Sequence, residues 1–220
     1  KGDKFMEIAL VMEYSTCAKN EIVYPILKKV AEAHGHTVTN YGQFNADDNR
    51  QTYIQNAFFI SALLNSGAAD FVVTGCGTGE GAMIAANAMP GVVCGLVAEP
   101  VSSFLFTQVN NGNCMSIPYA YQWGWAGEIN LEYIFEKLFA QEPGGGYPES
   151  SAKSEQENAI RTTKLKSFAN RPLTEVLEML DDEDLIERVK GGFAGVRYEM
   201  FKERCKCDKI LAAVDAVLAK

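Results

Sequence analysis

The chain has 220 residues, which is enough for one large domain or for one domain with a helical appendage. Its 28 acidic and 20 basic residues give a formal net charge of −8, and no basic stripe is present, so we expect no nucleic-acid partner. The sequence has no apolar run of the roughly 18 residues that a membrane span needs, so we expect no membrane partner either.

The six cysteines are scattered, and their spacing matches no disulfide framework of a short secreted domain. Cys205 and Cys207 are too close together and too isolated for a zinc site, which needs four ligands at characteristic spacings. We therefore expect reduced thiols, no metal, no cofactor and a cytoplasmic location.

Apolar runs and helical patterns alternate along the first two thirds of the chain. Strands are expected at 5–12, 37–41, 71–73, 92–97 and 114–117. Helices are expected at about 17–34, 52–65, 82–88, 102–109 and 125–139. This alternation predicts an α/β, Rossmann-like fold with a parallel five-stranded sheet and helices on both faces.

A glycine-rich hinge at 144–148 separates residues 1–143, the predicted Rossmann-like domain, from residues 144–220, a charged and mostly helical C-terminal extension. Gly191 and Gly192 are expected to break the helical pattern of this extension. We interpret the extension as helical cladding or as an oligomer contact.

The most informative stretch is the apolar run at 71–73 followed by a glycine-rich turn at 75–81 and by small helix-forming residues. A strand, a glycine turn and a helix in this order point backbone N–H groups and the positive end of a helix at one anion. Cys76 lies at the start of the turn, and a thiol beside a helix N-terminus ionises more readily, so it is a candidate base or nucleophile. The alternative is an ordinary α/β turn with an inert, buried cysteine.

Ligands of parallel sheets bind at the carboxyl ends of strands, where the strand order reverses. Three such ends carry polar groups in this sequence: Glu13-Tyr14, Cys76 to Thr78, and Glu99-Pro100. We expect all three to open on one edge of the sheet.

Several segments share their order and spacing with one known family. They are Cys76-Gly77-Thr78-Gly79-x-Gly81, Ile84-Ala85-Ala86-Asn87, Pro90-Gly91-Val92, Glu99-Pro100 and Asn110-x-x-Asn113. Over residues 6–139 the chain resembles the RpiB/LacA/LacB family of sugar-phosphate isomerases. The resemblance implies aldose–ketose isomerisation of a phosphorylated sugar through an enediolate, without a metal or cofactor. It also implies a homodimer or higher homo-oligomer whose sites lie near the subunit interface.

The resemblance assigns roles to individual residues. Cys76 would shuttle the proton, and Thr78 would hydrogen-bond a sugar oxygen or the thiol. Backbone amides at the glycine turn would stabilise the enediolate. The substrate-binding residues expected are Glu13, Tyr14, Tyr53, Gly77, Gly79, Gly81, Asn110, Arg161 and Lys164.

The chain departs from the family pattern at Tyr14, where family members carry histidine, and at Val109, which aligns with the ring-opening histidine. Valine cannot relay a proton, so another group opens the ring or the substrate is already open-chain. Glu80 would repel phosphate unless it points away. Arg161 and Lys164 are the candidate phosphate-binding cations, and their alternative is a solvated helix face.

Two other functions stay open: a sugar-phosphate-binding protein without activity, and an assembly protein that acts through its extension. A cysteine hydrolase is disfavoured, because a nucleophilic thiol needs a histidine within reach. The two histidines, His34 and His36, both precede the second expected strand and are expected at the surface.

Overall fold

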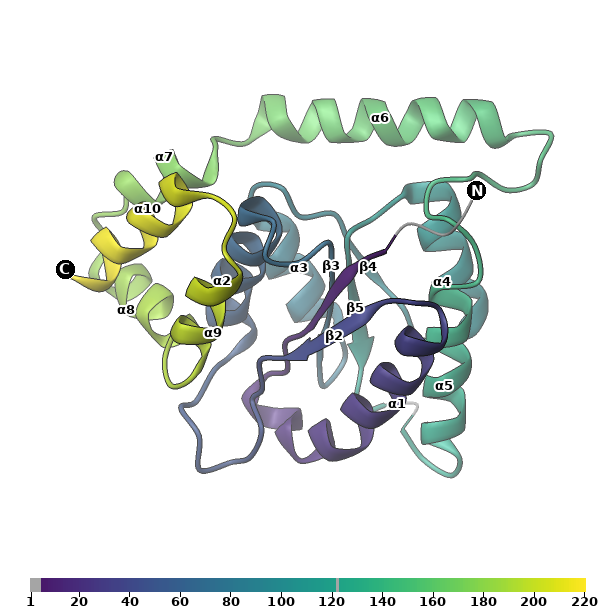
Figure 1. Ribbon diagram of the computed structural model, residues 1–220, viewed down its shortest axis with the longest axis horizontal. Coiled ribbons are helices and arrows are strands. Elements are labelled where there is room, and N and C mark those ends of the chain that lie inside the picture. Colours follow the sequence, from purple (N-terminus) through teal and green to yellow (C-terminus); the bar gives the residue numbers. More distant parts are fainter. Residues whose placement is uncertain (1–4, 122) are drawn as a thin grey trace.

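The computed structural model describes residues 5–121 and 123–220 (Figure 1). In this part of the chain, five parallel strands form one sheet in the order β2-β1-β3-β5-β4. The strands are β1 (Glu7–Leu10), β2 (Thr37–Asn40), β3 (Phe71–Cys76), β4 (Cys94–Leu96) and β5 (Cys114–Pro118). The Rossmann-like fold expected from the sequence is confirmed.

Helices cover both faces of the sheet (Figure 1). They are α1 (Asn20–Ala33), α2 (Tyr53–Ser66), α3 (Glu80–Ala88), α4 (Pro100–Leu105) and α5 (Gly127–Leu138). A 3-10 turn, η1 (Tyr14–Lys19), precedes α1, and a π-helical turn, η2 (Phe106–Asn110), extends α4. The predicted helix at 102–109 therefore consists of an α-helical segment followed by a π-helical one.

The central strands β1, β3 and β5 are mostly apolar because both of their faces are buried, whereas the edge strand β2 is mostly polar and partly exposed. Ile8 and Leu10 of β1 pack with α1 and α5 on one face, and Ala9 between them packs with α2 on the other. Successive side chains of a strand point to opposite faces of the sheet, and on either face of β1 they meet a helix.

The C-terminal extension contains α6 (Ala152–Ala169), α7 (Leu173–Glu178), α8 (Glu183–Gly192), α9 (Arg197–Arg204) and α10 (Asp208–Leu218). Helices α7 to α10 lie beside α2 (Figure 1), and their apolar side chains join the same core cluster. The ring of Phe59 in α2 is 5.1 Å from that of Phe193 and 6.4 Å from that of Phe201. The domain boundary at residue 144 stays a prediction, but one hydrophobic core contains side chains from both sides of it.

The break expected at Gly191 and Gly192 is confirmed, since α8 ends at Gly192 and a turn at 193–196 leads to α9. A Cβ at Gly191 would lie 2.1 Å from Nε2 of Gln55, and one at Gly192 would lie 2.6 Å from the Gln55 carbonyl oxygen. The glycines therefore also let the end of α8 approach α2 closely.

Helix α6 stands apart from the other helices and crosses the top of the view in Figure 1. Ala159 is its buried residue, while Ile160, Leu165 and Phe168 are 57%, 67% and 89% exposed. No helix in the described residues is both long and apolar enough to cross a bilayer.

Candidate functional site

Cys76 is the last residue of β3 and is 7% exposed. The strand continues three residues beyond the predicted end, because β5 pairs with it as far as Cys76 and Pro118. The chain after β5 keeps this pairing: Tyr119 N donates to Cys76 O at 2.9 Å, and Ala120 N donates to Gly77 O at 2.9 Å. The sheet thus holds the backbone of Cys76 where the buried strand becomes an exposed turn.

The chain on both sides of Cys76 is packed so closely that Gly75 in β3 and Gly79 in the turn exclude any side chain. A Cβ at Gly75 would lie 2.2 Å from the Ile117 carbonyl oxygen, and one at Gly79 would lie 2.6 Å from Cδ1 of Leu96. Gly79 also has a φ of +76°, which favours glycine. Ser116 Oγ donates to Gly79 O at 2.6 Å, which ties the turn to β5.

Helix α3 begins directly after this turn, with Gly79 as its N-cap. The N–H of Met83 donates to Gly79 O at 3.0 Å, so the N–H groups of residues 80–82 lie at the open end of the helix. Thr78 Oγ1 accepts from the N–H of Glu80 at 3.3 Å. Thr78 and Glu80 are both exposed. The helix start presents amides and a positive dipole end at the mouth of the turn.

The chain after β1 runs along the end of β3. Leu10 and Val73 are in register, Val11 N donates to Val73 O at 2.9 Å, and Thr74 Oγ1 donates to Val11 O at 2.7 Å, so Glu13 and Cys76 lie at the same edge of the sheet. Glu13 is buried at 5% exposure, and its carboxylate accepts a hydrogen bond from Ser15 Oγ. The sequence prediction that these two strand ends open on one edge is thereby confirmed.

The start of α2 brings Tyr53 to the same edge. A Cβ at Gly81 would lie 3.4 Å from Cζ of Tyr53, so the glycine leaves room for the ring. Tyr14 N donates to Gln51 O at 2.8 Å, and the Arg50 guanidinium lies 4.6 Å from the centre of the Tyr14 ring. Two tyrosines and one arginine therefore gather near the glycine turn.

Glu99 follows β4, and β5 lies between β4 and β3. Because β5 separates the two strands, Glu99 opens on the same edge as Cys76 but is not beside it. The neighbours that β5 supplies instead, Tyr119 and Ala120, carry no signal in the sequence that distinguishes them from core residues.

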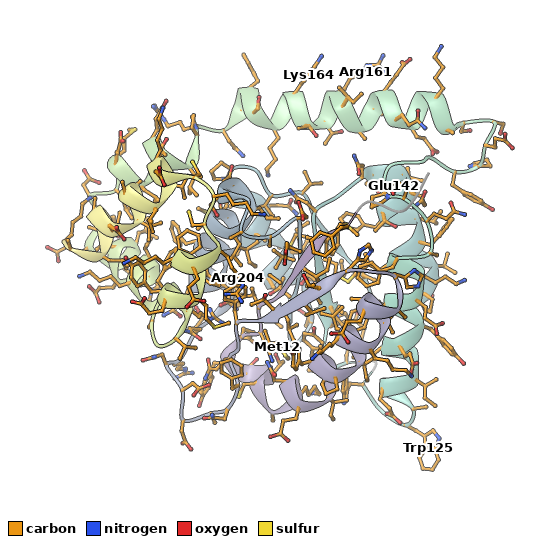
Figure 2. All side chains as sticks on the ribbon, in the orientation of Figure 1. Met12, Trp125, Glu142, Arg161, Lys164 and Arg204 are labelled. Atoms are coloured by element: carbon orange, nitrogen blue, oxygen red, sulfur yellow. The ribbon has the colours of Figure 1, made fainter. Side chains whose placement is uncertain are left out.

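Asn110, Arg161 and Lys164 do not meet Cys76 within one chain. Asn110 ends η2, before the first residue of β5, and lines a space with Cys94 at the start of β4 and with Ala159 of α6. That is the amino edge of the sheet. Arg161 and Lys164 point away from the body of the molecule in Figure 2, and Arg161 binds Glu157 at 2.9 Å.

The histidines flank Gly35, which follows α1, and so lie before the amino end of β2. His36 is buried at 5% exposure, with its ring 5.0 Å from that of Phe139. The surface position expected for His36 is therefore wrong, because the end of α5 covers it.

Sequence reasoning missed Arg197, the first residue of α9, which is 1% exposed. Its guanidinium donates at 2.7–3.4 Å to five oxygens: the carbonyls of Met12, Tyr41, Gly42 and Gly192 and the side chain of Asn56. Burial lowers the pKa of Arg197 to about 9, so the side chain is still a cation at neutral pH. The extension thereby holds the backbone directly before Glu13.

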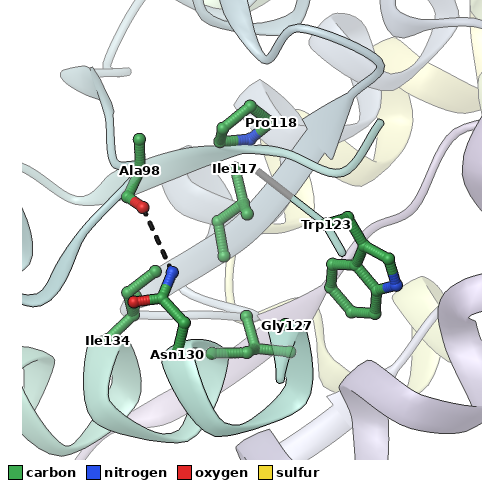
Figure 3. Close-up of a pocket in the computed structure, with 8 residues that line it drawn as sticks. Ala98, Ile117, Pro118, Trp123, Gly127, Asn130 and Ile134 are labelled. Carbon is green, nitrogen blue, oxygen red and sulfur yellow. Dashed lines mark hydrogen bonds between the residues drawn. The ribbon is translucent and has the colours of Figure 1, made fainter. Parts of the chain in front are cut away.

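A small pocket lies at the carboxyl ends of β4 and β5, under α5 (Figure 3). Its lining includes Ile117, Trp123 and Asn130, and Asn130 Nδ2 donates to the Ala98 carbonyl at 3.3 Å. The volume of about 10 Å³ has room for about one water molecule. A sugar therefore does not bind there, and the open edge beside Cys76 is the better candidate.

Comparison with known proteins identifies the family. The family model described as Ribose/Galactose Isomerase matches residues 8–138, which include β1 to β5 and the glycine turn. A search of curated proteins found no match.

Two solved structures are similar over nearly the whole chain, including the extension. One is a 4-deoxy-L-threo-5-hexosulose-uronate ketol-isomerase complexed with a tartrate, at 44% identity and a TM-score of 0.92. The other is a ribose-5-phosphate isomerase from Vibrio parahaemolyticus, at 43% identity and a TM-score of 0.92. Each covers 98% of this chain and 100% of its own.

The type B ribose 5-phosphate isomerase of Leishmania infantum shares the fold, with 19% identity, a TM-score of 0.61 and coverage of 76% of this chain and 100% of its own. The family model matches more than half of the chain, and the two fuller matches exceed 40% identity. This chain therefore belongs to the ribose/galactose isomerase family.

Proposed function

We propose that this protein is an aldose–ketose isomerase that acts on an acidic, open-chain sugar, with Cys76 as the base. The observation that carries the proposal is the position of Cys76 between the end of β1 and the amide-rich start of α3. An enediolate develops negative charge, and preorganised N–H groups at a helix N-terminus stabilise such charge.

The proton transfer balances within the sugar. The Cys76 thiolate takes the proton from the hydroxyl-bearing carbon beside the carbonyl, the C–H electron pair forms the double bond of the enediolate, and the carbonyl oxygen takes up the negative charge. The hydroxyl proton on the deprotonated carbon passes to that oxygen, so the old hydroxyl becomes the new carbonyl. The thiol then returns the proton to the neighbouring carbon, which converts ketose to aldose or the reverse. Thr78 is exposed beside the thiol and can hydrogen-bond a sugar oxygen.

Two substrate classes compete, because the two fuller matches are a uronate isomerase and a sugar-phosphate isomerase. We favour a keto-uronate. Val109 cannot open a sugar ring, and a keto-uronate that is already open-chain needs no ring opening. Arg161 and Lys164, the cations expected to hold a phosphate, lie on α6, which packs at the amino edge of the sheet, whereas Cys76 ends β3 at the carboxyl edge of the same chain.

A substrate panel tests the proposal. We expect interconversion of a 4-deoxy-hexosulose uronate, and much slower or no interconversion of ribose 5-phosphate and galactose 6-phosphate. If a sugar phosphate is turned over faster than the uronate, the keto-uronate assignment is wrong but the isomerase assignment stands. Calorimetric binding of these sugars without turnover of any would instead support the inactive binding protein.

We also propose that the protein is a cytoplasmic homodimer. All six cysteines are free thiols, as in proteins of reducing compartments. The exposed apolar side chains of α6 favour a contact with a second copy. Asn110 lies on the amino edge of the sheet, away from Cys76 of its own chain. It can therefore contribute to a site at Cys76 only in a second copy of the chain.

Light scattering of the full chain should give twice the 24.1 kDa mass of one chain. Phe168→Asp, on α6, should weaken the dimer, whereas Met179→Asp, at an exposed apolar residue after α7, should not. A wild-type mass of one chain, or equal effects of the two substitutions, would contradict the α6 contact.

A further inference from the structure

We propose that Arg50 binds the anionic end of the substrate and that Tyr14 positions it. This inference rests on the proposed function, because it names the group that recognises the acid on the sugar. The shared chemistry is an oxyanion, either a carboxylate or a phosphate.

The first observation is the stacking of Arg50 on Tyr14. The guanidinium carbon lies 4.6 Å from the ring centre, within the range of a cation–π contact. Tyr14 follows Glu13 and begins η1, after β1, at the edge of the sheet where β3 ends in Cys76. An uncharged ring thus holds a cation at the strand end that borders the reacting thiol.

The second observation is that the backbone on both sides of Arg50 is fixed. Gln51 O accepts from Tyr14 N at 2.8 Å, and Gln51 N donates to Gln43 Oε1 at 3.1 Å. Gln43 and Gln51 are both buried, at 1% and 4% exposure. Asp48 Oδ2 accepts from the N–H groups of Phe44 and Asn45, which closes the preceding turn.

The third observation is that Arg50 is exposed and contacts the Tyr14 ring, and that it forms no ion pair with a carboxylate of the described residues. Asp48, the nearest acid along the chain, is engaged by two backbone N–H groups. A planar guanidinium that stacks by its face keeps its N–H edge for a ligand, and that edge fits a carboxylate or a phosphate.

The fourth observation is the route from Arg50 to the glycine turn. Three residues after Arg50, Tyr53 begins α2 and lies against Gly81. Arg50 contacts Tyr14, and Tyr53 contacts the first turn of α3, so the short segment from Arg50 to Tyr53 connects the two. A sugar with its carbonyl at Cys76 can extend its acidic end toward Arg50.

The test measures anion binding and kinetics on the full chain. Isothermal calorimetry with tartrate and with inorganic phosphate compares wild type, Arg50→Gln and Arg50→Lys. We expect Arg50→Gln to weaken binding by about 10- to 100-fold, as the loss of a charge-assisted bidentate contact does. Arg50→Lys should keep part of the affinity. Tighter binding of tartrate than of phosphate assigns the site to carboxylates, and the reverse order assigns it to phosphates.

Tyr14 variants separate positioning from general charge. Tyr14→Phe keeps the ring and should retain the affinity more fully than Tyr14→Leu, which should lose about 3- to 5-fold. Arg171→Gln removes an exposed arginine on another part of the surface and should change nothing.

In kinetics, Arg50→Gln should raise KM by at least 10-fold, while kcat falls by no more than about 3-fold. The reason is that the contact between Arg50 and the acid group stabilises the ground state and the transition state equally. An unchanged Kd and KM in Arg50→Gln, a loss equal to that in Arg171→Gln, or no anion binding by wild type would overturn the proposal. If wild type binds an anion through Arg50 but turns over no sugar of the panel, the proposed function fails and this inference stands.

Discussion

Cys76→Ala is expected to reduce kcat by about 10²- to 10⁴-fold, which is the contribution of a well-placed general base. The reason is that the thiolate alone carries the proton between the two carbons in the proposed mechanism. Binding should change little, since the amides at the start of α3 and Arg50 remain in place.

The decisive measurement is the exchange of the proton beside the carbonyl with deuterium oxide, followed by NMR with a substrate of the panel. Cys94 provides a matched control, because it is also a free cysteine with 7% exposure but lies at the start of β4. Cys94→Ala should exchange at the wild-type rate. Undiminished exchange in Cys76→Ala would remove the base assignment.

The parts of this site that could be predicted are local ones. The apolar run before Cys76 and the glycines after it encode a buried strand and a tight turn within a dozen residues. The family pattern added Tyr53, and the structure places its ring at Gly81. Each of these features depends on neighbours in sequence or on a fixed spacing.

The parts that could not be predicted depend on long-range packing. Nothing between residues 92 and 118 indicates that β5 lies between β3 and β4, so the sequence predicts the shared edge of Glu99 and Cys76 but not the strand that separates them. Gly191 and Gly192 indicate the end of a helix, but nothing in the sequence reveals that Gln55 packs against them.

A buried arginine is the hardest residue to predict from the sequence, since arginine is usually exposed. The partners of Arg197 are mostly backbone oxygens, which carry no sequence signal. Arg197 is 156 residues away from Tyr41 and 185 away from Met12. Only the packing of α9 beside α2 brings these groups together.

Arg197→Met is therefore the second large effect that we expect. The substitution should lower the free energy of unfolding by about 3–5 kcal/mol, because it leaves buried oxygens without their donor. Arg197→Lys keeps the charge but cannot reach five oxygens at once, so its loss should be intermediate. Urea unfolding followed by circular dichroism measures the difference.

Arg171→Met is the matched control, since Arg171 is 62% exposed and pairs with Glu175 at 3.7 Å. Exposed pairs contribute little, so the urea midpoint should hardly move. A midpoint equally unmoved in Arg197→Met would contradict the anchoring role.

The same substitution bears on catalysis, because one of the five acceptors is the carbonyl of Met12, directly before Glu13. Below the unfolding transition, kcat/KM of Arg197→Met should fall, and Arg197→Lys should restore part of it. A fully active but less stable Arg197→Met protein would show that the extension stabilises the fold without holding the site.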